Sequence, residues 1–165
     1  MNSRKVEWCF RKAEKEMNDS STHRGLLRVK PDLEKARNHV QKAEHYLKAT
    51  MYLKNGDFSD ISASTIFYAT YHCFLAILAR EGYESRNQEC TFALIQQLID
   101  ENLIDFDKKL IDNLASFDST SKETSIHIRE RFQYGTELHL GDDIYQKFVT
   151  LAKEVITQTK LLLEQ

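Results

Sequence analysis

The sequence predicts an all-α protein, an antiparallel bundle of four to five core helices with an extra N-terminal helix. The 165-residue chain contains one proline and five glycines, so few residues break helices. Apolar residues recur at helical spacing along most of the chain, and no alternating strand pattern competes with them. The segment 62–78 is apolar on nearly every side of a helix, which is typical of a helix inside a bundle.

Breakers and capping residues set the expected helix boundaries. Pro31 and Asp32 are favourable at a helix start, Asp57 or Ser59 would cap the central helix, and Asp142 would cap the last one. A capping box is expected at residues 120–123. The predicted helices span about residues 4–18, 31–55, 59–82, 87–102, 107–117, 120–141 and 142–162.

Two aromatic residues carry expectations about packing. Phe74 lies on the main apolar stripe of the central helix and should be fully buried. Trp8 should hold the first helix on the bundle. The polar stretch 19–30, between the first and second predicted helices, is expected to be a loop.

Composition narrows the function classes. Charged residues make up 29% of the chain and hydrophobic residues 41%, which predicts one soluble domain over 1–165, with helix and loop in 1–30 and the bundle in 31–165. The net charge of −2 gives no general attraction to nucleic acid or to an anionic membrane. Cys9, Cys73 and Cys90 lack metal-ligand spacing, so we expect free thiols, no metal and no cofactor in a cytoplasmic protein.

Three segments resemble the HEPN family of nucleotide-binding helical bundles. Phe67-Tyr68-Ala69-Thr70-Tyr71-His72 is similar to the family's Tyr-Tyr-Ala-x-Phe-His segment. The run from Arg129 to Gly135 resembles its late-helix segment, and 6–9 together with 89–91 are similar to an archaeal branch. The resemblance covers about residues 35–162 and implies a helical bundle that forms a two-fold homodimer, here through the helices carrying Tyr68 and Arg129.

The resemblance implies two activities. Many HEPN proteins are RNases with an Arg-x(4–6)-His motif, and others pair with a small MNT-type nucleotidyltransferase in toxin–antitoxin systems. This chain departs from the RNase spacing, since His139 lies ten positions after Arg129 and eight after Arg131. Arg131 and His139 would share a face only if the helix continued regularly through Gly135.

The candidate site residues follow from these segments. The catalytic candidates are Arg129, Arg131 and His139, and the ligand-binding candidates are Arg129, Arg131, Tyr134, Tyr68 and His72. Arg129 serves either a salt bridge or a phosphate site, and His72 is either a hydrogen-bonded interior histidine or a base. The sequence therefore favours a module that binds RNA, a nucleotide or a nucleotidyltransferase without cutting, and its alternative is a divergent metal-independent RNase.

Overall fold

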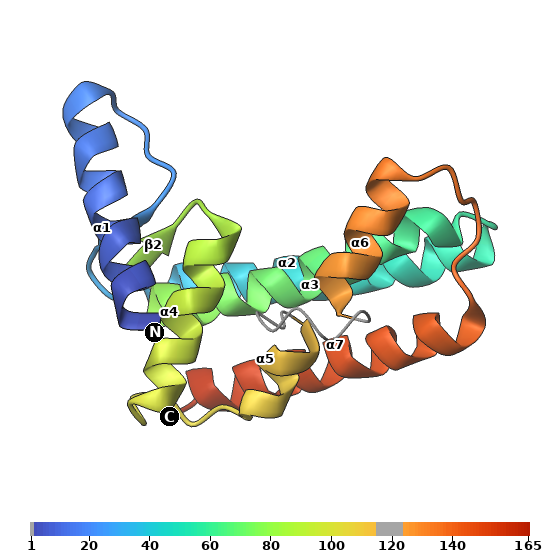
Figure 1. Ribbon diagram of the computed structural model, residues 1–165. Helices are drawn as coiled ribbons and strands as arrows, with labels where there is room; N and C mark the ends of the chain where they lie inside the picture. Colours follow the sequence, from blue (N-terminus) through green and yellow to red (C-terminus); the bar gives the residue numbers. More distant parts are fainter. Residues whose placement is uncertain (1, 115–123) are drawn as a thin grey trace.

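The computed structural model describes residues 2–114 and 124–165, and it confirms the all-α class (Figure 1). Its elements, in chain order, are α1 (Asn2–Asp19), β1 (Leu26–Arg28), α2 (Leu33–Asn55), α3 (Ser59–Arg80), β2 (Tyr83–Ser85), α4 (Gln88–Asp100), α5 (Lys108–Leu114), α6 (Ser125–Tyr134) and α7 (Asp142–Leu163). In Figure 1 the long helices α2, α3 and α7 run alongside one another, while α4 and α6 lie across them.

Helices α2 and α3 form a long antiparallel hairpin that organises the molecule. Asp32 caps α2 as predicted, because its side chain accepts a hydrogen bond from the backbone N–H of Lys35 at 2.8 Å. The predicted cap of α3 is wrong. Phe58 holds the N-cap position without a side-chain bond, and Ser59 is the first helical residue.

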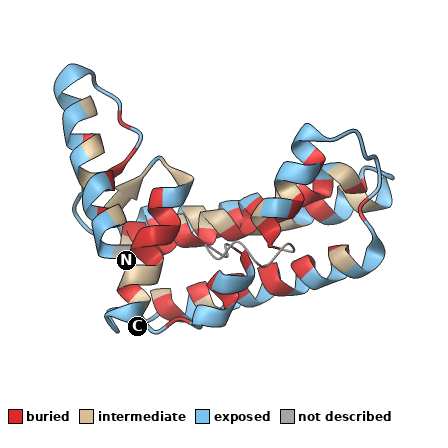
Figure 2. Ribbon diagram, viewed as in Figure 1, coloured by how far each residue is buried: buried red, intermediate tan, exposed pale blue. Residues whose placement is uncertain are grey.

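The core surrounds α3, whose buried residues follow almost its whole length (Figure 2). Phe74 is 0% exposed, as the stripe predicted, and its ring meets the rings of Phe92 and Phe106. Helix α3 packs against α2, α6 and α7, and α5 closes part of the bundle against α4, α6 and α7. Helix α3 is long and apolar enough to cross a membrane by composition alone, but 61% of its most apolar window is buried inside the protein.

The N-terminal region departs from the prediction in two ways. Residues 26–28, expected to be loop, form β1, which pairs antiparallel with β2 so that Leu27 lies opposite Glu84. Trp8 is 45% exposed and does not hold α1 in place. The fully buried side chains of α1 are the small ones of Val6, Cys9 and Ala13, and Phe10 packs partly buried against the core.

The expectation of three free thiols is also wrong. Cys9 of α1 and Cys90 of α4 form a disulfide that closes 81 residues of chain. Cys73 is the free cysteine, and complete burial raises the pKa of its thiol to about 12. Sequence spacing could not indicate the pair, because the two cysteines meet only through the tertiary fold.

The C-terminal boundaries need correction as well. Helix α6 begins after Thr124, whose side chain accepts from the N–H of His127, and ends at Tyr134 rather than near Gly141. Gly141, not Asp142, holds the N-cap position of α7. The expected capping box at 120–123 and the predicted end of α5 near Phe117 lie outside the described residues.

Candidate functional site

Four rings line up along one edge of the α2–α3 hairpin. Tyr68 packs on Tyr46 with ring centroids 5.5 Å apart, Tyr46 stacks on His72 at 5.5 Å, and His72 meets His39 at 5.2 Å. The α2 members are seven residues apart and the α3 members four apart, so each pair lies on one helix face. We call Tyr68, Tyr46, His72 and His39 the ring row. Tyr68 is 39% exposed and the other three are partly exposed, so the row is accessible from solvent.

The two histidines of the ring row are hydrogen-bonded to each other. The Nδ1 atoms of His39 and His72 lie 3.0 Å apart, so one ring carries its proton on Nδ1 and donates to the other. Burial, together with the neighbouring His39 and Lys42, lowers the pKa of His72 to about 4. Burial, followed by the charge of Lys35, also lowers the pKa of His39. Both imidazoles are therefore neutral at pH 7.

Positive charge at this edge comes from lysines. Lys42 is exposed and places its ammonium 5.3 Å from the ring centroid of Tyr46, a cation–π contact. Lys35 lies one turn before His39 and binds Glu84 of β2, with Nζ 3.3 Å from the carboxylate oxygen. The edge thus alternates aromatic surface with cationic groups.

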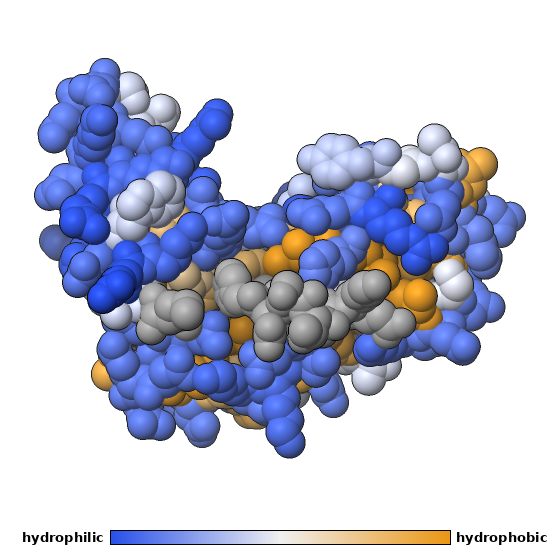
Figure 3. Space-filling view, in the orientation of Figure 1, coloured by the Kyte–Doolittle hydropathy of each residue, from blue (hydrophilic) through white to orange (hydrophobic). Residues whose placement is uncertain are grey.

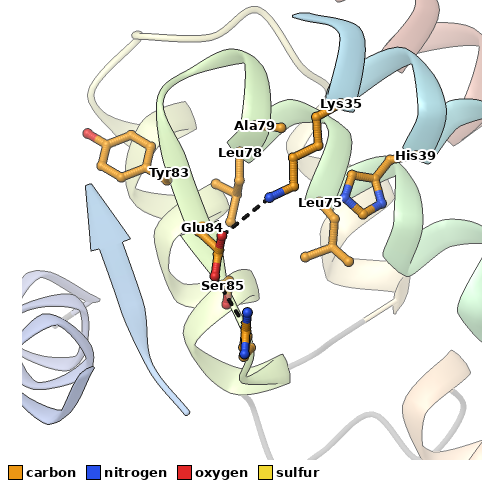
Figure 4. Close-up of a pocket in the computed structure, with 9 residues that line it drawn as sticks. Lys35, His39, Leu75, Leu78, Ala79, Tyr83, Glu84 and Ser85 are labelled. Atoms are coloured by element: carbon orange, nitrogen blue, oxygen red, sulfur yellow. Dashed lines mark hydrogen bonds and ion pairs between the residues drawn. The ribbon is translucent and has the colours of Figure 1, made fainter. Parts of the chain in front are cut away.

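A cleft of about 190 Å³ begins where the ring row ends at His39. Figure 4 shows Lys35 and Glu84 pointing toward each other across the cleft, and His39 beside Leu75. Leu75, Leu78 and Ala79 give the cleft an apolar floor. The remaining lining residues are Tyr83, Ser85 and Arg86. The cleft therefore offers apolar contact below and charged groups at its rim.

Glu84 connects the cleft to the N-terminal region. Its carboxylate accepts from Nε2 of buried His23 at 3.1 Å and pairs with Arg86 at 3.2 Å. The Nδ1 atom of His23 accepts the N–H of Gly25, so the His23 proton resides on Nε2. Burial acts to raise the pKa of Glu84, but the hydrogen bonds from His23 and Lys35 and the charges of Lys35 and Arg86 together lower it. The carboxylate therefore stays charged. It joins β2 to the loop after α1 through His23 and to α2 through Lys35.

Arg129 is not part of the ring row and contacts its neighbour Phe67 instead. Its guanidinium carbon is 4.4 Å from the ring centroid of Phe67, and its Nη1 donates to the side chain of Gln88 at 3.0 Å. Glu130 lies 3.8 Å away, so the salt-bridge alternative applies in part. The side chain is 13% exposed, and its buried Nε has no partner among the described residues.

The structure does not bring the other predicted residues, Arg131, Tyr134 and His139, together into one site. Arg131 is exposed and pairs with Glu137, with 2.8 Å between Nε and the carboxylate. Tyr134 is 79% exposed. His139 lies beyond the end of α6, with Nδ1 3.5 Å from the hydroxyl of Ser59. The helical face that Arg131 and His139 were to share does not exist, because α6 ends before Gly135.

The structure brings together Tyr68 and His72 of the predicted set and adds three residues from α2. His39, Tyr46 and Lys42 were not predicted, although their spacing of three, four and seven residues places them on one helix face. The missing information was which face of α2 lies beside His72. Only the hairpin packing supplies it.

Comparison with known proteins adds no family. No protein-family model matches the chain, and no curated protein matches it.

Figure 3 shows where apolar surface gathers on one face of the molecule. Most of that face is hydrophilic, above all over α1, and hydrophobic atoms gather beside α6. Elsewhere, exposed apolar side chains surround the turn between α2 and α3. They include Tyr52, Phe58 and Ile61.

Proposed function

We propose that the chain is a HEPN-like binding module whose ring row and neighbouring cleft bind single-stranded RNA or a nucleotide. The proposal extends to a cytoplasmic homodimer that pairs with a small MNT-type nucleotidyltransferase within a toxin–antitoxin system. The HEPN part rests on the segments 67–72 and 129–135, and the ligand class rests on the chemistry of the α2–α3 edge.

The observation that carries the proposal is the solvent-accessible ring row flanked by Lys35 and Lys42. Bases stack on aromatic side chains regardless of sequence, and lysines attract the phosphates between them. Tyr68 is 39% exposed, so part of the residue is open to contact with a base. An apolar cleft floor beside Lys35 and Arg86 would accept a second ring with its phosphate at the rim.

The histidine pair should make the binding of an anionic ligand depend on pH. A phosphate bound beside His39 and His72 favours the protonated imidazole, so it raises their pKa values. Binding and protonation are linked, and affinity should increase as the pH falls from 7 toward 5. A purely apolar ligand would not produce this dependence.

The geometry does not favour the RNase alternative. Cleavage requires a base and a cationic group at one phosphate. Arg129 contacts Phe67 and His139 contacts Ser59, and these α3 residues are eight positions apart, which is about 12 Å along a helix. We therefore expect binding with little or no turnover from the chain alone.

The test is a fluorescence titration of a labelled single-stranded RNA decamer at several salt concentrations. Tyr68→Ala should weaken binding by about 1–3 kcal/mol through the loss of one base stack. Lys42→Ala should reduce the salt dependence by about one counterion. Lys153→Ala, at an exposed lysine on α7, is the control and should behave as wild type.

Two outcomes would reject the proposed site. One is the absence of RNA and mononucleotide binding at low salt. The other is an equal loss of binding in Lys42→Ala and Lys153→Ala. Homodimer formation is tested separately by light scattering, in which a particle of 19.3 kDa at micromolar concentration would reject it.

A further inference from the structure

Helix α1 stands apart from the helical bundle in Figure 1 and packs mainly against α4 and β1. Its buried side chains, Val6, Cys9 and Ala13, are small. Of its large apolar side chains, Trp8 and Met17 are 45% and 43% exposed, and Phe10 is only partly buried against the core. Because the hydrophobic contribution grows with the apolar area buried, such a face holds a helix weakly.

The covalent bond from Cys9 to Cys90 joins α1 to the first turns of α4. Both residues are 0% exposed, so the bond lies inside the contact between the two helices. Close by, Lys5 pairs with Glu89 at 2.7 Å on the surface, where ion pairs contribute little. The disulfide is therefore the strongest connection between α1 and α4.

Contacts lead from this region to the cleft, through His23, and to Arg129, through Gln88. The loop after α1 carries His23, which donates to Glu84 in the cleft wall. Cys90 lies two residues after Gln88, the hydrogen-bond partner of Arg129. Gly25 packs so closely on α1 that an added Cβ would lie 2.3 Å from the Cys9 carbonyl oxygen. Displacing α1 therefore displaces the loop that holds His23.

We propose that the Cys9–Cys90 disulfide is a redox latch that holds α1 and its following loop on α4 while the bundle stays folded in either redox state. Two observations carry the proposal: the small size of the fully buried side chains of α1, and the position of the bond between α1 and α4, whereas most residues of the core belong to the chain from α3 to α7. This inference does not depend on RNA or nucleotide binding.

The chemistry is thiol–disulfide exchange with a dithiol reductant. One thiolate of the dithiol attacks a sulfur of the Cys9–Cys90 bond and forms a mixed disulfide, releasing the other cysteine as a thiolate that takes up a proton. The second dithiol sulfur then displaces the remaining cysteine. The dithiol loses two electrons and becomes a cyclic disulfide, and Cys9 and Cys90 each end as a thiol.

Hydrogen exchange on the full chain tests the latch, with oxidised glutathione or dithiothreitol setting the redox state and mass spectrometry identifying the bond. Reduction should accelerate amide exchange in residues 5–19 at least tenfold and leave exchange in α3 and α7 unchanged. Cys9→Ser with Cys90→Ser should match the reduced protein under both conditions. Cys73→Ser, which keeps the bond, should respond to reduction as wild type does.

Several results would overturn the latch. One is the recovery of Cys9 and Cys90 as free thiols after treatment with oxidised glutathione. Another is equal protection of α1 in the two redox states. Exchange that accelerates throughout α3 and α7 would show that the bond supports the whole fold rather than α1. Reduction of the unsubstituted chain gives the same readout if the double serine variant does not fold.

Discussion

Replacing Phe74 with alanine tests whether the core is centred on α3. The side chain is 0% exposed, so removing it costs about 3–5 kcal/mol in lost transfer energy and cavity formation. Its ring also makes edge contacts with Phe92 at 5.4 Å and Phe106 at 6.0 Å. Each aromatic pair adds about 0.5–1.5 kcal/mol, so we expect the upper part of that range, about 4–5 kcal/mol.

Urea denaturation followed by circular dichroism measures this loss, with an unchanged m-value as the check that the unfolding transition is the same. For a chain of this size the melting temperature should fall by roughly 10–20 °C. Tyr52→Ala removes an aromatic ring that is 80% exposed and should cost less than about 0.5 kcal/mol. A loss below about 1 kcal/mol for Phe74→Ala, or equal losses for the two variants, would refute the placement of the core.

Two further predictions concern backbone packing and pH. Gly25→Ala should destabilise the protein by about 1–3 kcal/mol because the new Cβ would overlap backbone atoms of Cys9 and Ala13, whereas Gly141→Ala, with nothing within 4 Å, should melt as wild type does. His72 has a pKa of about 4 in the folded protein and 6.5 as its ordinary value, so the unfolded chain takes up the proton first as the pH falls. Stability should therefore decrease between pH 6.5 and 4, and this part of the decrease should disappear in His72→Phe; identical pH profiles for the two proteins would contradict the lowered pKa.

The sequence by itself determined the helices and the central position of α3. Helical periodicity and capping are local properties, so the start of α2 at Asp32 and the burial of Phe74 could be predicted. Capping patterns gave a wrong prediction where a side chain makes a tertiary contact instead of capping its own helix. Ser59, expected to cap α3, instead accepts the N–H of Leu140 from the distant loop before α7.

The α2 half of the candidate site and the disulfide were decided by tertiary structure alone. Tyr68 and His72 could be singled out from the sequence, but their partners on α2 depend on the rotation of that helix within the hairpin, which periodicity does not fix. Cys9 and Cys90 are separated by 81 residues, and only the docking of α1 on α4 brings their sulfur atoms together. Contacts between distant segments depend on how helices pack, so no local pattern in the chain records them.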